Sequence, residues 1–128
     1  MKFKIDTKEK FRVITLEEPQ LSAIMSDNLR KLLMNYLSDP IQNIILNLTL
    51  TNHISAEVAQ VLVDVQQEFY NHNHSFVICC LQKEAEKELD QYEALELLNT
   101  TPTESEAWDI IQMEEIEREL LGDENETE

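Results

Sequence analysis

Hydrophobic and polar residues alternate near the beginning of the chain, in the pattern of two β-strands. Phe3 and Ile5 alternate with charged residues over positions 2–6, and a second strand segment, the largely apolar 11–16, follows a polar turn at 7–10. A period of two places successive side chains on opposite faces of a sheet. The two segments are therefore predicted to pair as an antiparallel hairpin.

After the hairpin, helical spacing alternates with continuous apolar runs. The segments 22–37 and 56–70 carry apolar residues at i, i+4 and i+7, which predicts two amphipathic helices. Ser55 precedes the second helix directly, where its hydroxyl can serve as the N-cap. The runs 41–48 and 75–81 are almost uniformly apolar, as is typical of strands buried on both faces in a parallel sheet.

The rest of the chain predicts a short helix, a loop and a long final helix. Residues 83–89 form the short helix, and the acids and lysines of 83–90 are interpreted as its solvated face. Residues 99–102 are a loop with room for a short edge strand. A capping-box sequence at 103–106 opens the final helix, which can run to Leu121. Gly122, the only glycine, is expected to end it as the C-cap.

This order of elements predicts the α/β class. Strands that alternate with helices after an opening hairpin form a mixed, mainly parallel sheet, here of four to five strands. Right-handed crossovers place both long helices, 22–37 and 56–70, on one face of that sheet. The final helix extends the fold beyond this arrangement.

Composition and charge narrow the range of partners. The chain has 128 residues, of which 42% are hydrophobic, enough for a folded core, and its net charge is −16. Residues 104–128 alone hold eleven acids and one base. Such a chain is not suited to bind a nucleic-acid backbone or an anionic membrane. It has no apolar run of ~20 residues and no signal-peptide pattern at its start, so we expect a cytoplasmic protein.

Catalytic, metal and cofactor motifs are mostly missing. One glycine is too few for a phosphate-binding loop or a dinucleotide fingerprint. His72 and His74 could form half of a metal site, but without a nearby cysteine a solvated loop is the commoner interpretation. Ser55 and His53 could be a nucleophile and its base, or a helix cap beside a polar loop residue. We therefore predict no enzyme activity, no metal and no cofactor.

The two cysteines, Cys79 and Cys80, are adjacent in the second apolar run. Neighbouring residues of a strand point to opposite faces, so a disulfide between them would be strained. We expect two small apolar residues in a reducing compartment.

One stretch of sequence resembles a known family. Residues 47–62 read Asn-Leu-Thr-Leu-Thr-Asn-His-Ile-Ser-Ala-Glu-Val-Ala-Gln-Val-Leu, a strand, a loop and a helix start. With the order β-β-α-β-α-β-α, this resembles the STAS domain of bacterial anti-sigma factor antagonists, over about residues 1–112. The family segment usually reads Ile-Asp-Ser-Ser-Gly-Leu. An ungapped match places Ile54 on its Ile, Ser55 on its Asp, and Ala56 on the Ser or Thr that a partner kinase phosphorylates.

The resemblance implies a STAS-like fold and a non-catalytic protein-interaction module in bacterial signalling. The partner would be an anti-sigma factor with kinase activity or a larger signalling scaffold, bound through Asn52, His53, Ser55, Ala56 and Glu57. Ala56 has no hydroxyl, so the phosphate switch is missing, unless a one-residue shift makes Ser55 the acceptor. Glu57 either complements the helix dipole or acts as a constant partial mimic of phosphate.

The final helix departs from the family pattern, in which it usually ends sooner. Ile110, Met113, Ile116 and Leu120 follow i, i+3, i+6 and i+10 spacing. We therefore divide the chain into a domain at 1–112, a helix extension at 113–121 and a disordered acidic tail at 122–128. The extension either folds back onto the body or projects, with Trp108 as an anchor at the junction. A projecting extension would dock a partner helix or a second copy, and the alternative function is a self-assembling scaffold that dimerises through this helix.

Overall fold

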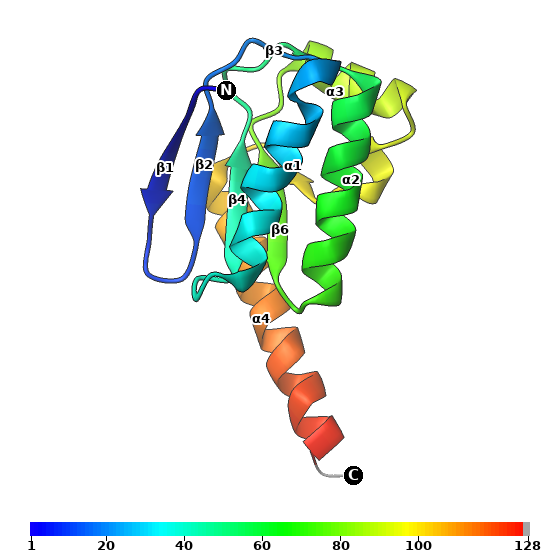
Figure 1. Ribbon diagram of the computed structural model, residues 1–128. Coiled ribbons are helices and arrows are strands. Elements are labelled where there is room, and N and C mark those ends of the chain that lie inside the picture. Colours follow the sequence, from blue (N-terminus) through cyan, green and yellow to red (C-terminus); the bar gives the residue numbers. More distant parts are fainter. Residues whose placement is uncertain (127–128) are drawn as a thin grey trace.

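The chain folds around a five-stranded sheet with helices on both faces (Figure 1). The structure is a computed structural model that describes the backbone of residues 1–126 and the side chains of residues 1–121. In spatial order, the strands are β1 (Phe3–Thr7), β2 (Arg12–Leu16), β4 (Asn43–Asn47), β6 (Ser75–Cys79) and β7 (Thr100–Thr101). The pair β1–β2 is antiparallel and the other pairs are parallel. The predicted hairpin and mainly parallel sheet are therefore confirmed.

A second, very small sheet was not predicted. It pairs β3 (Gln20–Leu21) with β5 (His53–Ile54) in parallel. Strands of two residues are too short to show a period in the sequence. They join the segment after the hairpin to the segment before the second long helix.

The helices lie in the predicted segments, but the first predicted helix is divided. The segment 22–37 is not one helix, because α1 (Ser26–Met34) is flanked by the 3₁₀ turns η1 (Ala23–Met25) and η2 (Asn35–Ser38). Tight 3₁₀ turns are common at helix ends. The remaining helical elements are α2 (Ala56–Asn71), α3 (Lys83–Gln91), the 3₁₀ turn η3 (Leu95–Leu97) and α4 (Glu104–Glu126).

The main core lies between the sheet and the two long helices α1 and α2, which cover the same face as predicted (Figure 1). Every residue of β4 and β6 is buried, because these central strands are covered on both faces. In this core Phe69 of α2 packs against Phe76 of β6, with ring centroids 5.5 Å apart. The continuous apolar runs thus indicated the two central strands correctly.

The first turns of α4 cover the opposite face of the sheet, a placement that the sequence did not predict. Ala107 and Ile111 form a second buried cluster with residues of β2, β4 and β6. Trp108 stacks on Phe11, with ring centroids 4.6 Å apart. The aromatic pair packs the second turn of the helix against the segment that leads into β2.

Beyond the sheet, α4 projects from the body (Figure 1). Met113, Ile116 and Leu120 are exposed, so the extension does not fold back. The helix continues past Gly122 to Glu126, so Gly122 is not its C-cap. The disorder expected for residues 122–128 stays a prediction, since their side chains and the backbone of 127–128 lie outside the described residues.

Candidate functional site

The start of α2 lies at the edge of the sheet where the parallel strands β4 and β6 both end. The carboxyl edge of a parallel sheet is a common place for binding sites in α/β folds. The loop after β4 leads into β5 and then into α2, and the Gln82 side chain, in the loop after β6, donates a hydrogen bond to the Thr49 carbonyl at 2.6 Å. The two loops are therefore joined at this edge.

Backbone hydrogen bonds fix the path of the chain into α2. The amides of Asn52 and His53 donate to the Pro19 carbonyl at 2.7 and 3.2 Å, and the Ser55 amide donates to the Leu21 carbonyl at 2.9 Å. These bonds belong to the small β3–β5 sheet. The segment before the helix is thus a hydrogen-bonded strand and not the polar loop that the sequence indicated.

Ser55 is the N-cap of α2, as predicted. Its backbone is extended, and its hydroxyl oxygen accepts a hydrogen bond from the Val58 amide at 3.1 Å. Such a bond satisfies one of the free amides of the first turn. The Ser55 side chain is half-buried, and its hydroxyl oxygen caps the helix.

The structure places the five predicted partner-binding residues together at the start of α2. His53, Ala56 and Glu57 are exposed, while Asn52 and Ser55 are half-buried. Glu57 lies in the first helical turn, where a carboxylate is favourable beside the positive end of the helix dipole. The assignment of Ala56 to the phosphoacceptor position remains a prediction from the sequence.

Glu88 of α3 also belongs to this site and was missed. Its carboxylate oxygen Oε1 accepts a hydrogen bond from the Ile54 amide at 3.1 Å and lies 3.3 Å from His53 Nδ1. The interpretation of Glu88 as part of a solvated helix face was therefore wrong. The sequence did contain one sign of this placement. Glu88 is three residues after Ala85 and one before Leu89, the two buried positions of α3, so it lies beside the buried side of that helix.

Two exposed apolar residues extend this surface and were not predicted. Leu50, in the loop after β4, is 49% exposed, and Ile24, in the 3₁₀ turn η1 that packs against α2, is 89% exposed. Exposed apolar residues rimmed by polar ones are characteristic of protein-interaction surfaces. The site therefore combines apolar side chains with the polar helix start.

The geometry does not assemble a catalytic group at this site. Ser55 is bonded to the Val58 amide and His53 faces Glu88, and within the described residues no hydrogen bond joins Ser55 to His53. No group of three or more His, Cys, Asp or Glu in the described part of the chain could hold a metal ion. Likewise, no described helix is both long and apolar enough to cross a membrane.

Both cysteines are free thiols. Cys79 is buried, as expected, and burial raises the pKa of its thiol above the ordinary value, with the neighbouring Cys80 adding to the effect. Cys80 is only half-buried, and its φ of 63° turns the chain out of β6. A buried thiol with a raised pKa holds little reactive thiolate, so Cys79 is a packing residue.

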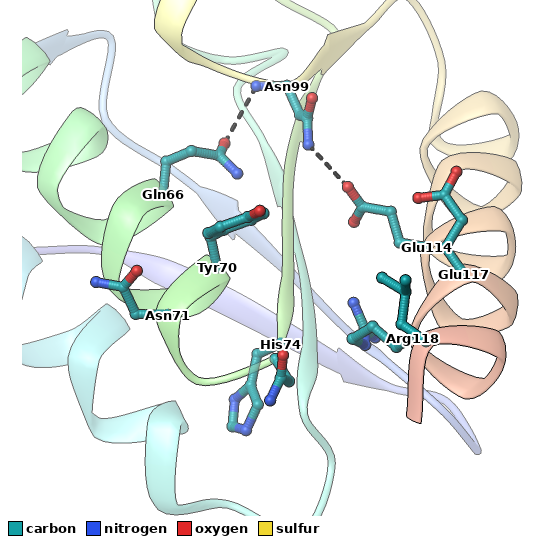
Figure 2. A pocket seen from close by; sticks show the side chains of 10 residues that line it. Gln66, Tyr70, Asn71, His74, Asn99, Glu114, Glu117 and Arg118 are labelled. Carbon is teal, nitrogen blue, oxygen red and sulfur yellow. Dashed lines mark hydrogen bonds between the residues drawn. The ribbon is translucent and has the colours of Figure 1, made fainter. Parts of the chain in front are cut away.

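A cavity of about 400 Å³ lies at the other end of the molecule between α2 and α4 (Figure 2). The backbone amide of Asn99 donates to Gln66 Oε1 at 3.1 Å, and the side-chain amide of Asn99 donates to the Glu114 carboxylate at 3.2 Å. Arg118 donates to the Ser75 hydroxyl at 3.0 Å. These bonds tie α4 to the edge of the sheet and to α2.

His74 lines this cavity and is not the solvated loop residue that the sequence indicated. Its Nδ1 atom is buried, without a hydrogen-bond partner in the described structure. Burial lowers the pKa of His74 below its ordinary 6.5, and the positive charges of His72 and Arg118 lower it further. The folded protein therefore favours the neutral imidazole.

This lowered pKa predicts a loss of stability in weakly acidic solution. Between the folded pKa and 6.5 the unfolded chain binds a proton that the folded chain does not, so the free energy of unfolding falls as the pH drops below about 6.5. The lowered pKa values of Asp39 and Asp64 act separately, below about their ordinary 3.8. Urea unfolding at pH 7.5, 6.5 and 5.5 measures the effect. We expect His74→Asn to flatten the curve; equal curves for wild type and His74→Asn would contradict this account.

Comparisons with known proteins agree with the architecture. The family model of the STAS domain matches residues 2–107, while a search of curated proteins finds no match. The solved anti-sigma factor antagonist SpoIIAA in its unphosphorylated form is similar at 15% identity and TM-score 0.68, covering 87% of this chain and 96% of that chain. An anti-sigma factor antagonist from Mycobacterium paratuberculosis has 8% identity and TM-score 0.74, covering 87% and 93%. A chain of the stressosome, a signal integration and transduction hub, has 16% identity and TM-score 0.65, covering 85% and 96%. At these identities the solved structures show a shared fold.

Proposed function

The chain belongs to the STAS domain family, and from this premise we propose that it is a non-catalytic interaction module of bacterial signalling, of the anti-sigma factor antagonist kind. In this proposal the start of α2 docks on a regulatory protein in the cytoplasm. The partner is an anti-sigma factor with kinase activity or a signalling scaffold. Solved proteins of the same fold are described as an anti-sigma factor antagonist and as a part of the stressosome, a signal integration and transduction hub.

The observation that carries this proposal is the exposed helix start with its hydrogen-bonded backbone. His53, Ala56 and Glu57 are exposed on a segment whose backbone is held by the Pro19 and Leu21 carbonyls. A surface that is already ordered loses little conformational entropy when a partner binds. The nearby exposed Leu50 supplies apolar area for the centre of a contact.

We further propose that docking is not controlled by phosphate. Ala56 has no hydroxyl, and the Ser55 hydroxyl is occupied by the Val58 amide as the helix cap. The neighbour SpoIIAA is described as an anti-sigma factor antagonist in its unphosphorylated form. In this chain the negative charge at the helix start is the permanent carboxylate of Glu57.

Reversal of the Glu57 charge tests the docking surface. We expect Glu57→Lys to weaken binding of the regulatory partner about tenfold in isothermal titration, because it reverses one charge at the centre of the surface. Glu106→Lys is the matched control, since Glu106 is an exposed acid in the first turn of α4, on the opposite face of the sheet. Unchanged binding by Glu57→Lys, or an equal loss in both variants, would remove this surface from the proposal.

Self-assembly through α4 is a second candidate function, supported by the exposed apolar residues of the projecting helix. Two copies joined along these residues would form a dimer. Light scattering of the full chain distinguishes this candidate from the first. A monomer at concentrations near 100 μM, where even weak dimers are populated, contradicts self-assembly.

A further inference from the structure

The projecting helix α4 has two apolar faces that point in opposite directions. Ala107 and Ile111 are buried against the sheet, whereas Met113, Ile116 and Leu120 are 61%, 58% and 61% exposed. At about 100° per residue, Leu120 lies roughly 180° around the helix from Ile111. We call Met113, Ile116 and Leu120 the outer face of α4. Because it points away from the sheet, the body of the protein cannot cover it.

Polar contacts fix the rotation of the helix, so the outer face stays outside. Glu114 is held by the Asn99 side chain at 3.2 Å, and Arg118 donates to the Ser75 hydroxyl at 3.0 Å. Figure 2 shows Glu114 and Arg118 on the side of α4 that faces β6 and the cavity. Rotation of the outer face toward the body would break both contacts.

The outer face is flanked almost entirely by acids. Asp109, Glu117 and Glu119 lie along or beside it by helical spacing. Arg118, the only base of α4, faces the sheet. Lys10 of the hairpin is the one base that lines the hollow next to Ile116, which it shares with Trp108 and Glu115. The surroundings of the outer face are therefore strongly negative.

From this arrangement we propose that the outer face of α4 binds a basic amphipathic helix of a partner protein. An apolar stripe between acids is complementary to an apolar stripe between lysines and arginines. A second copy fits less well, because two outer faces in contact would bring six of these carboxylates to one seam. This site is independent of the start of α2, and either can fail while the other holds.

A designed peptide and the sole tryptophan provide the test. The probe is a helix of about 18 leucine and lysine residues with leucine on one face, long enough to cover the roughly 17 Å from Asp109 to Leu120. Trp108 lines the hollow beside Ile116, so its fluorescence reports docking on the full chain. A scrambled peptide of the same composition has the same charge without the stripe, and a leucine–glutamate peptide has the stripe with the opposite charge.

We expect saturable binding of the basic stripe peptide only, at least tenfold tighter than the scrambled peptide. Ile116→Ser with Leu120→Ser should weaken binding at least tenfold, because both lost side chains bury apolar area. Leu97→Ser is the matched control, since Leu97 is 57% exposed on the distant η3 turn, and it should change nothing. Equal binding of the scrambled peptide, or undiminished binding by the double variant, overturns the proposal. A concentration-dependent dimer in light scattering that Ile116→Ser dissolves also overturns it, and assigns the outer face to a second copy.

Discussion

Replacing Phe69 with alanine is expected to lower the free energy of unfolding by about 3–5 kcal/mol, the range for removal of a buried aromatic ring. Phe69 is fully buried, and its ring packs against Phe76 and the edge of His74, with centroids 5.5 and 5.9 Å away. It joins the second half of α2 to β6. The free energy of unfolding of a small domain is about 5–15 kcal/mol in total. This one substitution therefore removes much of the stability.

Tyr70, the residue next to Phe69, supplies the control variant for this prediction. Tyr70 is 75% exposed on the same helix, so Tyr70→Ala should change the free energy of unfolding by less than about 0.5 kcal/mol. Urea unfolding followed by circular dichroism measures both variants. An unchanged dependence of the free energy of unfolding on urea concentration shows that the unfolded state is the same. Equal losses in the two variants would mean that α2 does not pack on the sheet as described.

The second large effect concerns partner binding. Ala56→Glu is expected to weaken binding of the regulatory partner about 100-fold in isothermal titration. The new side chain puts bulk and charge at the centre of the proposed surface, where one residue can contribute about 2–3 kcal/mol. An acid at the first position of a helix is favourable to the helix dipole, so the folded state should not be weakened.

Two variants separate the position from the charge. Ala56→Ser adds one oxygen and should leave binding within about twofold of the wild type, less than 0.5 kcal/mol. Gln67→Glu adds the same charge at an exposed position nearer the other end of α2, and should also bind normally. If Gln67→Glu weakens binding as much as Ala56→Glu, net charge and not the helix start governs the interaction.

Local sequence patterns were sufficient to predict the parts of the fold that depend on local physics. The hairpin followed from alternation, the buried strands β4 and β6 from continuous apolar runs, and the Ser55 cap from a hydroxyl before a helical stripe. In each case neighbouring residues determine the outcome. The 3₁₀ turns η1 and η2 were missed, because residues 22–37 fit one apolar stripe although the backbone tightens at both ends.

Contacts between distant segments could not be predicted in the same way. The β3–β5 pair joins residues more than 30 positions apart and involves only two residues per strand. The bond from the Ile54 amide to Glu88 likewise depends on how α3 is placed. The spacing of Ile110, Met113, Ile116 and Leu120 indicated one stripe on α4, whereas Ile111 packs on the sheet and Met113, Ile116 and Leu120 face outward. Which residues of a helix meet the sheet depends on the tertiary structure.

The central claim is that the start of α2 presents a methyl group, and not a hydroxyl, to the regulatory partner. Intact-mass spectrometry after incubation with an anti-sigma factor kinase from the same organism tests it most directly. The account predicts that the wild type stays unmodified and that Ala56→Ser gains one phosphoryl group. A phosphoryl group on wild-type Ser55 would contradict it.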